Sequence, residues 1–384
     1  MELDLSWILI GLPLAFALGW IASRLDLRQL RLAHRQAPRA YFRGLNHLLN
    51  EQQDQAIDAF IEAVQNDPDT SELHFALGNL FCRRGEYDRA VRVHEHLLSR
   101  GDLGNADRQR AQHGLALDFL KAGLLDRAED ALRKLEGSPF EGQARLARLA
   151  IYERSREWPE AAQVAALLER SGEANFSVRQ AHYRCEQARE AFAKGDATQA
   201  LNILARTVAE TPEAPRPRIL LGQLYLTQNQ ASKAYDCLAP LFTQTDANAP
   251  LAAATLVKAA QNAQKQSEAA SLLLAHYERQ PSIDVLEALT SLEAPADTHG
   301  TAARQHYLDH LQKRPSLIAA TRWLGSASSD QAIPAAVQKA LETASRPLAR
   351  YRCAACGFEA KEHFWHCPGC QAWDSYPPRR VEEL

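Results

Sequence analysis

Four cysteines near the C-terminal end of this 384-residue chain have the residue type and spacing to do chemistry. They form two Cys-x-x-Cys pairs, Cys353 with Cys356 and Cys367 with Cys370, with ten residues between the pairs. Each pair can fold as a tight turn that presents two thiolates to one ion, and four thiolates give the closed coordination of a structural metal. The pattern predicts one metal ion in a four-cysteine site, and because four thiolates accept either metal, iron and zinc both stay open.

Two disulfides are the alternative for these cysteines, but the spacing suits a metal better and a reducing compartment is inferred below. A segment of about 28 residues cannot bury an adequate core alone, so we expect the metal to supply much of its folding free energy. Nearby aromatic side chains are expected to seal the ion from water: Tyr351, Phe358, Phe364, Trp365, Trp373 and Tyr376.

The segment Tyr351–Gly357, Tyr-x-Cys-x-x-Cys-Gly, followed by Cys367–Cys370, Cys-Pro-x-Cys, resembles the metal knuckles of rubredoxin. Two features depart from that pattern. Gln371 stands where a glycine would follow the last cysteine, and the ten-residue spacer is shorter than in rubredoxins that carry electrons. Both departures favour a metal clip that shapes a docking surface over an electron carrier.

The first element that must position this site is an apolar N-terminal segment. Leu5–Ser23 contains no charged residue, and nineteen residues rise about 28 Å as a helix, close to the thickness of a bilayer core. Trp7 and Trp20 lie near its two ends, where aromatic belts sit. A cleaved signal peptide is the alternative, but the start carries Glu2 and Asp4 and no basic residue. Residues 5–23 are therefore predicted to be a transmembrane helix.

Positive charge after the apolar segment predicts its orientation. Six arginines follow it within residues 24–43, which places this side in the cytoplasm and residues 1–4 in the periplasm. Most of the chain is then cytoplasmic, where thiols stay reduced. Residues 24–36 are a basic juxtamembrane segment whose arginines can rest on anionic headgroups at about 1 kcal/mol each, or act only as a stop-transfer signal. These membrane-surface candidates are Arg24, Arg28, Arg31 and Arg35.

The middle of the chain has the period of a helical repeat. Leu77–Phe81 and Leu221–Tyr225 fit the L-G-x-x-Y signature of the first tetratricopeptide helix. A small residue recurs every 33 to 39 positions, as Ala56, Ala90, Ala128, Ala161, Ala200, Ala234, Ala269 and Ala303. We expect an all-α tetratricopeptide superhelix of about seven or eight repeats over residues 37–315, with a plain helical bundle as the alternative.

First helices of such repeats line a concave groove. Polar residues predicted to face it are Asn79, Arg83, Arg110, His113, Lys121, Arg154, Arg189, Arg216 and Gln223. Basic residues outnumber acidic ones, so an acidic or extended peptide partner would suit this groove. An ordinary solvated helix face is the alternative for each of these residues.

The remaining segments and the composition limit the function. Residues 316–350 are expected to be a helical connector that packs residues 351–378, the metal domain, against the last repeats, and residues 379–384 a tail. Net charge is −3 and the pI is near 6.5, so no general attraction to nucleic acid is implied. No phosphate-binding loop, nucleophile elbow or zinc-protease motif occurs, so we expect no enzyme activity.

Anchor, repeat array and knuckle in this order, with Phe-Trp-His-Cys-Pro-x-Cys-x-x-Trp at residues 364–373, resemble the lipopolysaccharide assembly protein B family of Gram-negative bacteria. The resemblance implies an inner-membrane adaptor with cytoplasmic repeats. Such an adaptor restrains lipopolysaccharide synthesis by promoting degradation of the LpxC deacetylase by the protease FtsH, and it coordinates lipopolysaccharide assembly. The implied partners are FtsH, LpxC, other lipopolysaccharide assembly proteins and the membrane, with a homo-oligomer left open.

Other functions stay open at this point. The chain could be a membrane-tethered, rubredoxin-like redox protein, or a generic tetratricopeptide scaffold for another membrane complex. A nucleic-acid-binding zinc ribbon is disfavoured because the knuckle carries few basic residues, Arg352 and Lys361.

Overall fold

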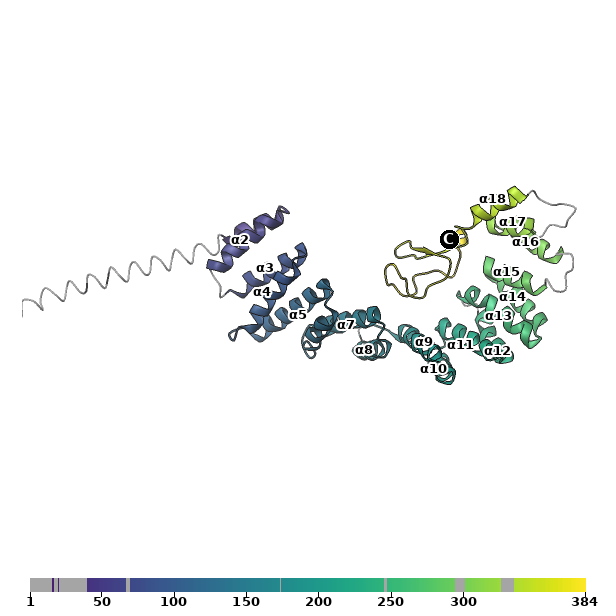
Figure 1. Ribbon diagram of the computed structural model, residues 1–384, viewed down its shortest axis with the longest axis horizontal. Helices are drawn as coiled ribbons and strands as arrows, with labels where there is room; N and C mark the ends of the chain where they lie inside the picture. Colours follow the sequence, from purple (N-terminus) through teal and green to yellow (C-terminus); the bar gives the residue numbers. More distant parts are fainter. Residues whose placement is uncertain are drawn as a thin grey trace, which may run out of the picture. The chain divides into compact units, whose positions relative to one another are not determined.

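The computed structural model describes Phe16, Trp20 and residues 40–66, 70–172, 174–244, 247–293, 301–325 and 335–384 (Figure 1). These residues fall into two compact units, 1–156 and 157–384. The predicted spanning helix, 5–23, and the basic segment, 24–36, lie outside the described residues, except that Phe16 and Trp20 are helical and exposed. Among the helices of the described ranges, none combines the length and apolar character needed to cross a bilayer.

The first unit is helical throughout its described part. Residues 40–49 are helical and are followed by α2 (Gln53–Asn66), α3 (Ser71–Arg84), α4 (Tyr87–Ser99), α5 (Asn105–Ala122), α6 (Leu125–Arg133) and α7 (Glu141–Ser155). Each helix packs on the next along the chain, α3 on α4 and α4 on α5, and first helices of successive pairs also touch, α3 on α5.

The second unit continues the helix pairs and ends in a small hairpin. Its elements are α8 (Trp158–Arg170), α9 (Ser177–Ala193), α10 (Ala197–Glu210), α11 (Pro215–Thr227), α12 (Ala231–Thr243), α13 (Ala249–Ala263), α14 (Gln266–Arg279), α15 (Ile283–Glu293), α16 (Thr301–Lys313), α17 (Leu317–Gly325), α18 (Ala335–Ser345), β1 (Tyr351–Arg352), β2 (Glu359–Ala360) and the 3-10 helix η2 (Val381–Glu383). Strands β1 and β2 are antiparallel, with Tyr351 opposite Ala360.

The recurring alanines explain how the helices of each pair approach one another. Each is the fourth residue of an even-numbered helix, and all from α2 to α14 are 0 % exposed: Ala56, Ala90, Ala128, Ala161, Ala200, Ala234 and Ala269. Gly78 and Gly222 of the L-G-x-x-Y signature lie on the first helix of a pair and allow close approach of the second helix. A Cβ on Gly78 would lie 2.9 Å from the His94 ring, and one on Gly222 would lie 2.7 Å from Leu238. The described helices therefore form the predicted all-α tetratricopeptide array.

Turns between paired helices follow from single residues in the left-handed region. Gly85 ends α3 with φ +84°, and Gly123 ends α5 with φ +78°. Glycine adopts this conformation at little cost, and the following amide then bonds back to the last turn of the helix. Here Glu86 N donates to Phe81 O at 2.9 Å and Leu124 N donates to Phe119 O at 2.9 Å.

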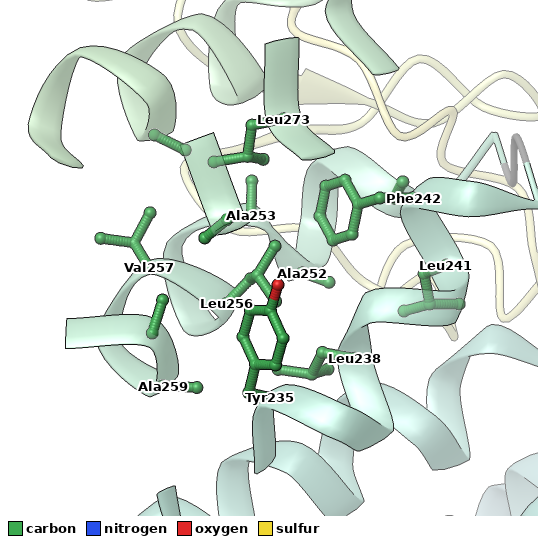
Figure 2. Packing of buried hydrophobic residues seen from close by; sticks show 14 of the residues in the cluster. Tyr235, Leu238, Leu241, Phe242, Ala252, Ala253, Leu256, Val257, Ala259 and Leu273 are labelled. Atoms are coloured by element: carbon green, nitrogen blue, oxygen red, sulfur yellow. The ribbon is translucent and has the colours of Figure 1, made fainter. Parts of the chain in front are cut away.

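An apolar core holds α11 to α15 of the second unit together. Figure 2 shows Tyr235, Leu238 and Phe242 of α12 packed on Leu256 of α13 and Leu273 of α14. All of these side chains except Tyr235 are fully buried. Burial of this apolar surface fixes α11, α13 and α15 as neighbours, since α11 contacts α13 and α13 contacts α15. We call the surface formed by α9, α11, α13, α15 and α17 the first-helix face of the second unit.

Candidate metal centre and its docking surface

Two matching turns bring the four cysteines together. Gly357 N donates to Cys353 O at 2.9 Å, and Gln371 N donates to Cys367 O at 2.8 Å. Both turn residues lie in the left-handed region, Gly357 at φ +76° and Gln371 at φ +60°. Gln371 therefore takes the conformation that a glycine would favour there, at some cost in backbone strain.

The four sulfurs fit a tetrahedral ion. They all lie within 4.8 Å of one another, with Cys353 Sγ 3.8 Å from Cys370 Sγ and Cys356 Sγ 3.7 Å from Cys367 Sγ. Metal–sulfur bonds of about 2.3 Å in a tetrahedron place sulfurs about 3.8 Å apart, so the spacing matches one ion. The donor set accepts iron or zinc.

Hydrogen bonds favour the ionised forms of Cys353 and Cys367. Burial opposes the charged form of Cys353, but the Ser375 hydroxyl and the backbone amides of Cys356 and Ala355 lower the pKa of Cys353 to about 6. Cys356 differs. A backbone amide hydrogen bond from Phe358 lowers its pKa, yet partial desolvation and hydrogen bonds with the other cysteine sulfurs raise that pKa to about 12. Four crowded thiolates need a cation to balance their charge, which is what a bound metal supplies.

The aromatic residues near the cysteines have two different roles. Tyr351 and Tyr376 are buried against Cys353 and Cys367 and form the small core of the metal domain, with Phe364 packed beside it. Phe358 is exposed over 43 % of its surface, so it does not belong to the buried core of the metal domain.

The two tryptophans contact the repeats rather than the cysteine core. Trp373 stacks on His182 of α9, with ring centroids 5.0 Å apart, and meets Tyr183 edge to face at 5.9 Å. Trp365 lies 5.6 Å from the His182 ring and packs on the core cluster of α11 to α15. The metal domain is therefore anchored on the first-helix face by its own aromatic side chains, and it lies inside the curve of α9 to α15 in Figure 1.

A partly buried polar network accompanies the aromatic contact. His182 Nε2 lies 2.9 Å from Asp374 Oδ1, and Arg216 pairs with Glu186. Burial lowers the pKa of His182, so the neutral ring donates from Nε2 to the Asp374 carboxylate. Arg216 Nη1 approaches His182 Nδ1 at 3.5 Å, which fits the same tautomer.

The last residues of the chain complete the docking. Arg380 pairs with Asp284 of α15 at 2.6 Å, and Tyr351 donates its hydroxyl proton to the same carboxylate at 3.2 Å. Glu383 accepts a hydrogen bond from Ile283 N, the first amide of α15, at 2.9 Å. Glu382 accepts from Leu317 N and from the Ser316 hydroxyl at the start of α17.

These carboxylates supply the capping that first-turn amides of a helix require. Residues 379–384, which were expected to be only a tail, connect the metal domain to α15 and α17. The connector 316–350 also takes part, because Leu348 and Ala349 pack on Ile283 and Ile318.

Predicted groove residues separate into two groups. In the first unit, Asn79, Arg83, Lys121 and Arg154 are exposed, Arg110 pairs with Glu72 at 2.7 Å and lies over the Phe75 ring, and His113 stacks on Phe140 at 4.7 Å. In the second unit, Arg189, Arg216 and Gln223 line an open cavity of about 530 Å³ against the metal domain. Their surface is thus shared with residues 351–380 of the same chain.

Sequence reasoning missed the residues that dock the metal domain. His182 and Asp374 are 192 positions apart, and Asp284 and Arg380 are 96 apart. Neither pair has a local spacing that marks it. The available signal was the unusual density of Trp and Tyr in the knuckle, which exceeds what a core of this size can bury.

Comparisons with known proteins agree with both modules. Residues 351–377 match a family model described as a rubredoxin metal binding domain, and residues 41–93 and 191–255 each match a tetratricopeptide repeat model. Lipopolysaccharide assembly protein B of Escherichia coli strain K12 is 32 % identical over 385 residues, with 98 % of each chain covered. The protein of that name from Haemophilus influenzae Rd is 27 % identical over 392 residues, covering 97 % of this chain and 98 % of that one.

Among solved structures, a tetratricopeptide repeat protein from Parabacteroides merdae is 15 % identical. The aligned region covers 67 % of this chain and 99 % of the Parabacteroides merdae chain, with a TM-score of 0.33. The fold and the site define a tetratricopeptide repeat protein with a C-terminal rubredoxin-type metal domain. The match over almost the whole length is more specific: the chain belongs to the lipopolysaccharide assembly protein B family.

Proposed function

We propose that this protein is an inner-membrane adaptor that restrains lipopolysaccharide synthesis by presenting the LpxC deacetylase to the protease FtsH. The observation that carries the proposal is the match to relatives named for lipopolysaccharide assembly over 98 % of both chains, which includes repeats and metal domain together. A domain-level likeness alone would support only a generic scaffold.

Exposed cations of the first unit support a partner surface there. Arg83, Lys121 and Arg154 lie on α3, α5 and α7, and each is exposed. None of the three forms an ion pair within the part of the chain that the structure describes. Charge of one sign along successive first helices suits an acidic segment of a protein partner and speeds its encounter.

The proposed anchor gives this surface its context. With residues 5–23 as a single-pass helix, the N-terminus outside and Arg24, Arg28, Arg31 and Arg35 on the cytoplasmic headgroups, the repeats are confined to the plane where a membrane protease works. Confinement raises the effective concentration of substrate and protease for one another. Other lipopolysaccharide assembly proteins, or a second copy of this chain, could join the same assembly.

An electron carrier is the second candidate, because Cys356 and Cys370 are exposed and a bound iron would lie near solvent. The two functions differ in their dependence on the metal. A structural ion can be exchanged for zinc without loss of function, whereas an electron carrier needs iron. We expect the zinc-loaded protein to keep its partner binding, and a reversible visible absorption change that is required for function would favour the redox role.

Reversal of three charges tests the partner surface. The variant carries Arg83→Glu, Lys121→Glu and Arg154→Glu, and a matched control carries Arg92→Glu, Lys134→Glu and Arg170→Glu at other exposed positions. We expect crosslinking in cells to recover LpxC and FtsH with wild type and control, and at least fivefold less with the first variant. Equal recovery from both well-folded variants would show that these cations are an ordinary solvated surface.

A further inference from the structure

An open cavity of about 530 Å³ separates part of the metal domain from the first-helix face. Its walls come from α9, α11, α13 and α15 on one side and from residues 351–380 on the other. Cavities between two packed modules are common places for small ligands. The metal ligands do not line this cavity, so it is distinct from the cysteine site.

Positive charge converges on the cavity from both sides. Arg189 and Arg216 come from the repeats, and Lys361 and Arg380 come from the metal domain. Glu186 forms ion pairs with Arg189 and Arg216, and Asp284 forms an ion pair with Arg380. Glu362 at the rim is exposed. Lys361 is exposed and has no ion-pair partner among the residues described, so its charge is available to a ligand.

Two lining residues also have unmet hydrogen-bonding capacity. Arg216 is only 4 % exposed, and its Nε has no hydrogen-bond partner within the described ranges. His363 is half-buried, and its Nδ1 likewise has no partner there, although its Nε2 bonds to Tyr376 O at 3.0 Å. Both atoms are buried, so they indicate imperfect packing beside the cavity, and direct contacts to a ligand would come from the exposed Lys361 and Arg189.

Part of the remaining lining is apolar. Ile219, Leu251 and Trp365 present hydrocarbon and ring surface between the charged groups. A ligand without an apolar part would leave this surface exposed to water, whereas a ligand with a short apolar group would bury it. The cavity therefore combines an unpaired Lys361, which lies beside Glu362 at the rim, with a partly apolar wall.

We propose that this cavity binds a small organic anion, a phosphate or carboxylate attached to a short apolar group. Its anionic oxygens accept hydrogen bonds from Lys361 and Arg189, and its apolar group lies on Leu251 and Trp365. Such a ligand touches both modules at once and strengthens their docking. The proposal is independent of the adaptor role, so either can fail without the other.

The test uses the purified full chain with its metal, at constant ionic strength, and titration calorimetry with four probes. Phenyl phosphate and benzoate carry the two anionic headgroups, inorganic phosphate lacks the apolar group, and benzylammonium has the opposite charge. We expect phenyl phosphate, benzoate or each of them to bind with a stoichiometry of one molecule per chain. Their affinity should be about tenfold higher than that of inorganic phosphate, and benzylammonium should not bind. Equal binding of all four probes, or of none, overturns the proposal.

Matched lysine variants place the site. Lys361→Gln should weaken binding of the aryl anion about tenfold, since a charge-assisted hydrogen bond is lost, whereas Lys339→Gln on α18 should leave it unchanged. In the wild-type chain the anion should slow acetylation of Lys361 and not of Lys339. Binding that survives Lys361→Gln with no protection of Lys361 would put the anion elsewhere and refute the assignment.

Discussion

His182 contacts several residues of the metal domain at its interface with the repeats, which we call the seam. Its ring is buried, stacks on Trp373, donates to the exposed Asp374 and lies beside the buried Arg216. Burial lowers its pKa, and burial also lowers the pKa of His363 on the other side of the seam. Both rings are therefore neutral when the metal domain is docked at neutral pH.

These lowered pKa values predict that docking weakens in acid. The ordinary pKa of histidine is about 6.5, so below that pH the undocked state binds more protons than the docked one. Docking free energy is fully present above about pH 6.5 and falls as the pH drops toward the lowered values. Limited proteolysis of the metal domain should be several times faster at pH 5.5 than at pH 7.5.

The substitution His182→Gln distinguishes protonation of His182 from other effects of low pH on docking. Glutamine can donate a hydrogen bond to Asp374 but has no proton to gain, so His182→Gln should flatten part of the pH dependence. The half-buried His306, which faces Glu293 at 3.1 Å outside the seam, is the control, and His306→Gln should leave the profile unchanged. A profile that is identical in wild type and His182→Gln would remove His182 from this account.

Cys367→Ser tests the metal site at the same scale. The Cys367 side chain is fully buried among the other ligands, so serine removes a thiolate from the interior of the site. We expect metal content to fall well below one ion per chain and the C-terminal segment to become sensitive to protease, while circular dichroism still shows helical repeats. Retention of stoichiometric metal by this variant would contradict the assigned ligand set.

At this scale the sequence predicted what has local spacing. The cysteine pairs are visible because both ligands of a turn lie three positions apart. The contacts of His182 with Asp374 and of Arg380 with Asp284 join distant segments. No local sequence pattern distinguishes these four residues from ordinary polar residues.

The C-terminal 3-10 helix η2 connects the metal domain to two helices of the repeats. Glu382 and Glu383 reach the first amides of α17 and α15, and Arg380 reaches Asp284. Its neighbourhood is apolar enough that burial raises the pKa of Glu383. Six residues that look like a polar tail therefore cap two helices of the array.

Loss of these caps should loosen the metal domain. Glu382→Ala leaves Leu317 N and the Ser316 hydroxyl without their acceptor, at a cost of about 1 kcal/mol. We expect hydrogen exchange of the Leu317 and Ile318 amides to accelerate about fivefold, and the exposed Glu190→Ala on α9 to have no such effect. Unchanged exchange at α17 would mean that η2 is a passive end of the chain.

For the helices, alanine and glycine periodicity was sufficient to predict pairs, because small residues mark where two helices touch. The same periodicity cannot show that residues 351–380 of the chain cover the first-helix face of α9 to α15. The connector was expected to carry the metal domain, and the aromatic and charged contacts of the knuckle itself share that role.

At the scale of the whole molecule, the proposed adaptor depends on three devices acting together. The predicted anchor confines the chain, the cations of the first unit offer a surface for a partner, and the metal domain completes the second unit. A version that starts near Ala37 should therefore be impaired because co-localisation is lost. Restoration of membrane attachment by an unrelated single-pass helix should rescue it, and failure of that rescue would give residues 5–23 a role beyond anchoring.

The half-life of LpxC after protein synthesis is blocked shows whether this protein acts as the proposed adaptor. It should be measured in cells with the protein, without it, and with a Cys353→Ser/Cys356→Ser version. We predict slower LpxC turnover in the second and third strains, with more lipopolysaccharide, because either the adaptor or its metal-dependent surface is missing. An LpxC half-life that is the same with and without this protein would contradict the adaptor account.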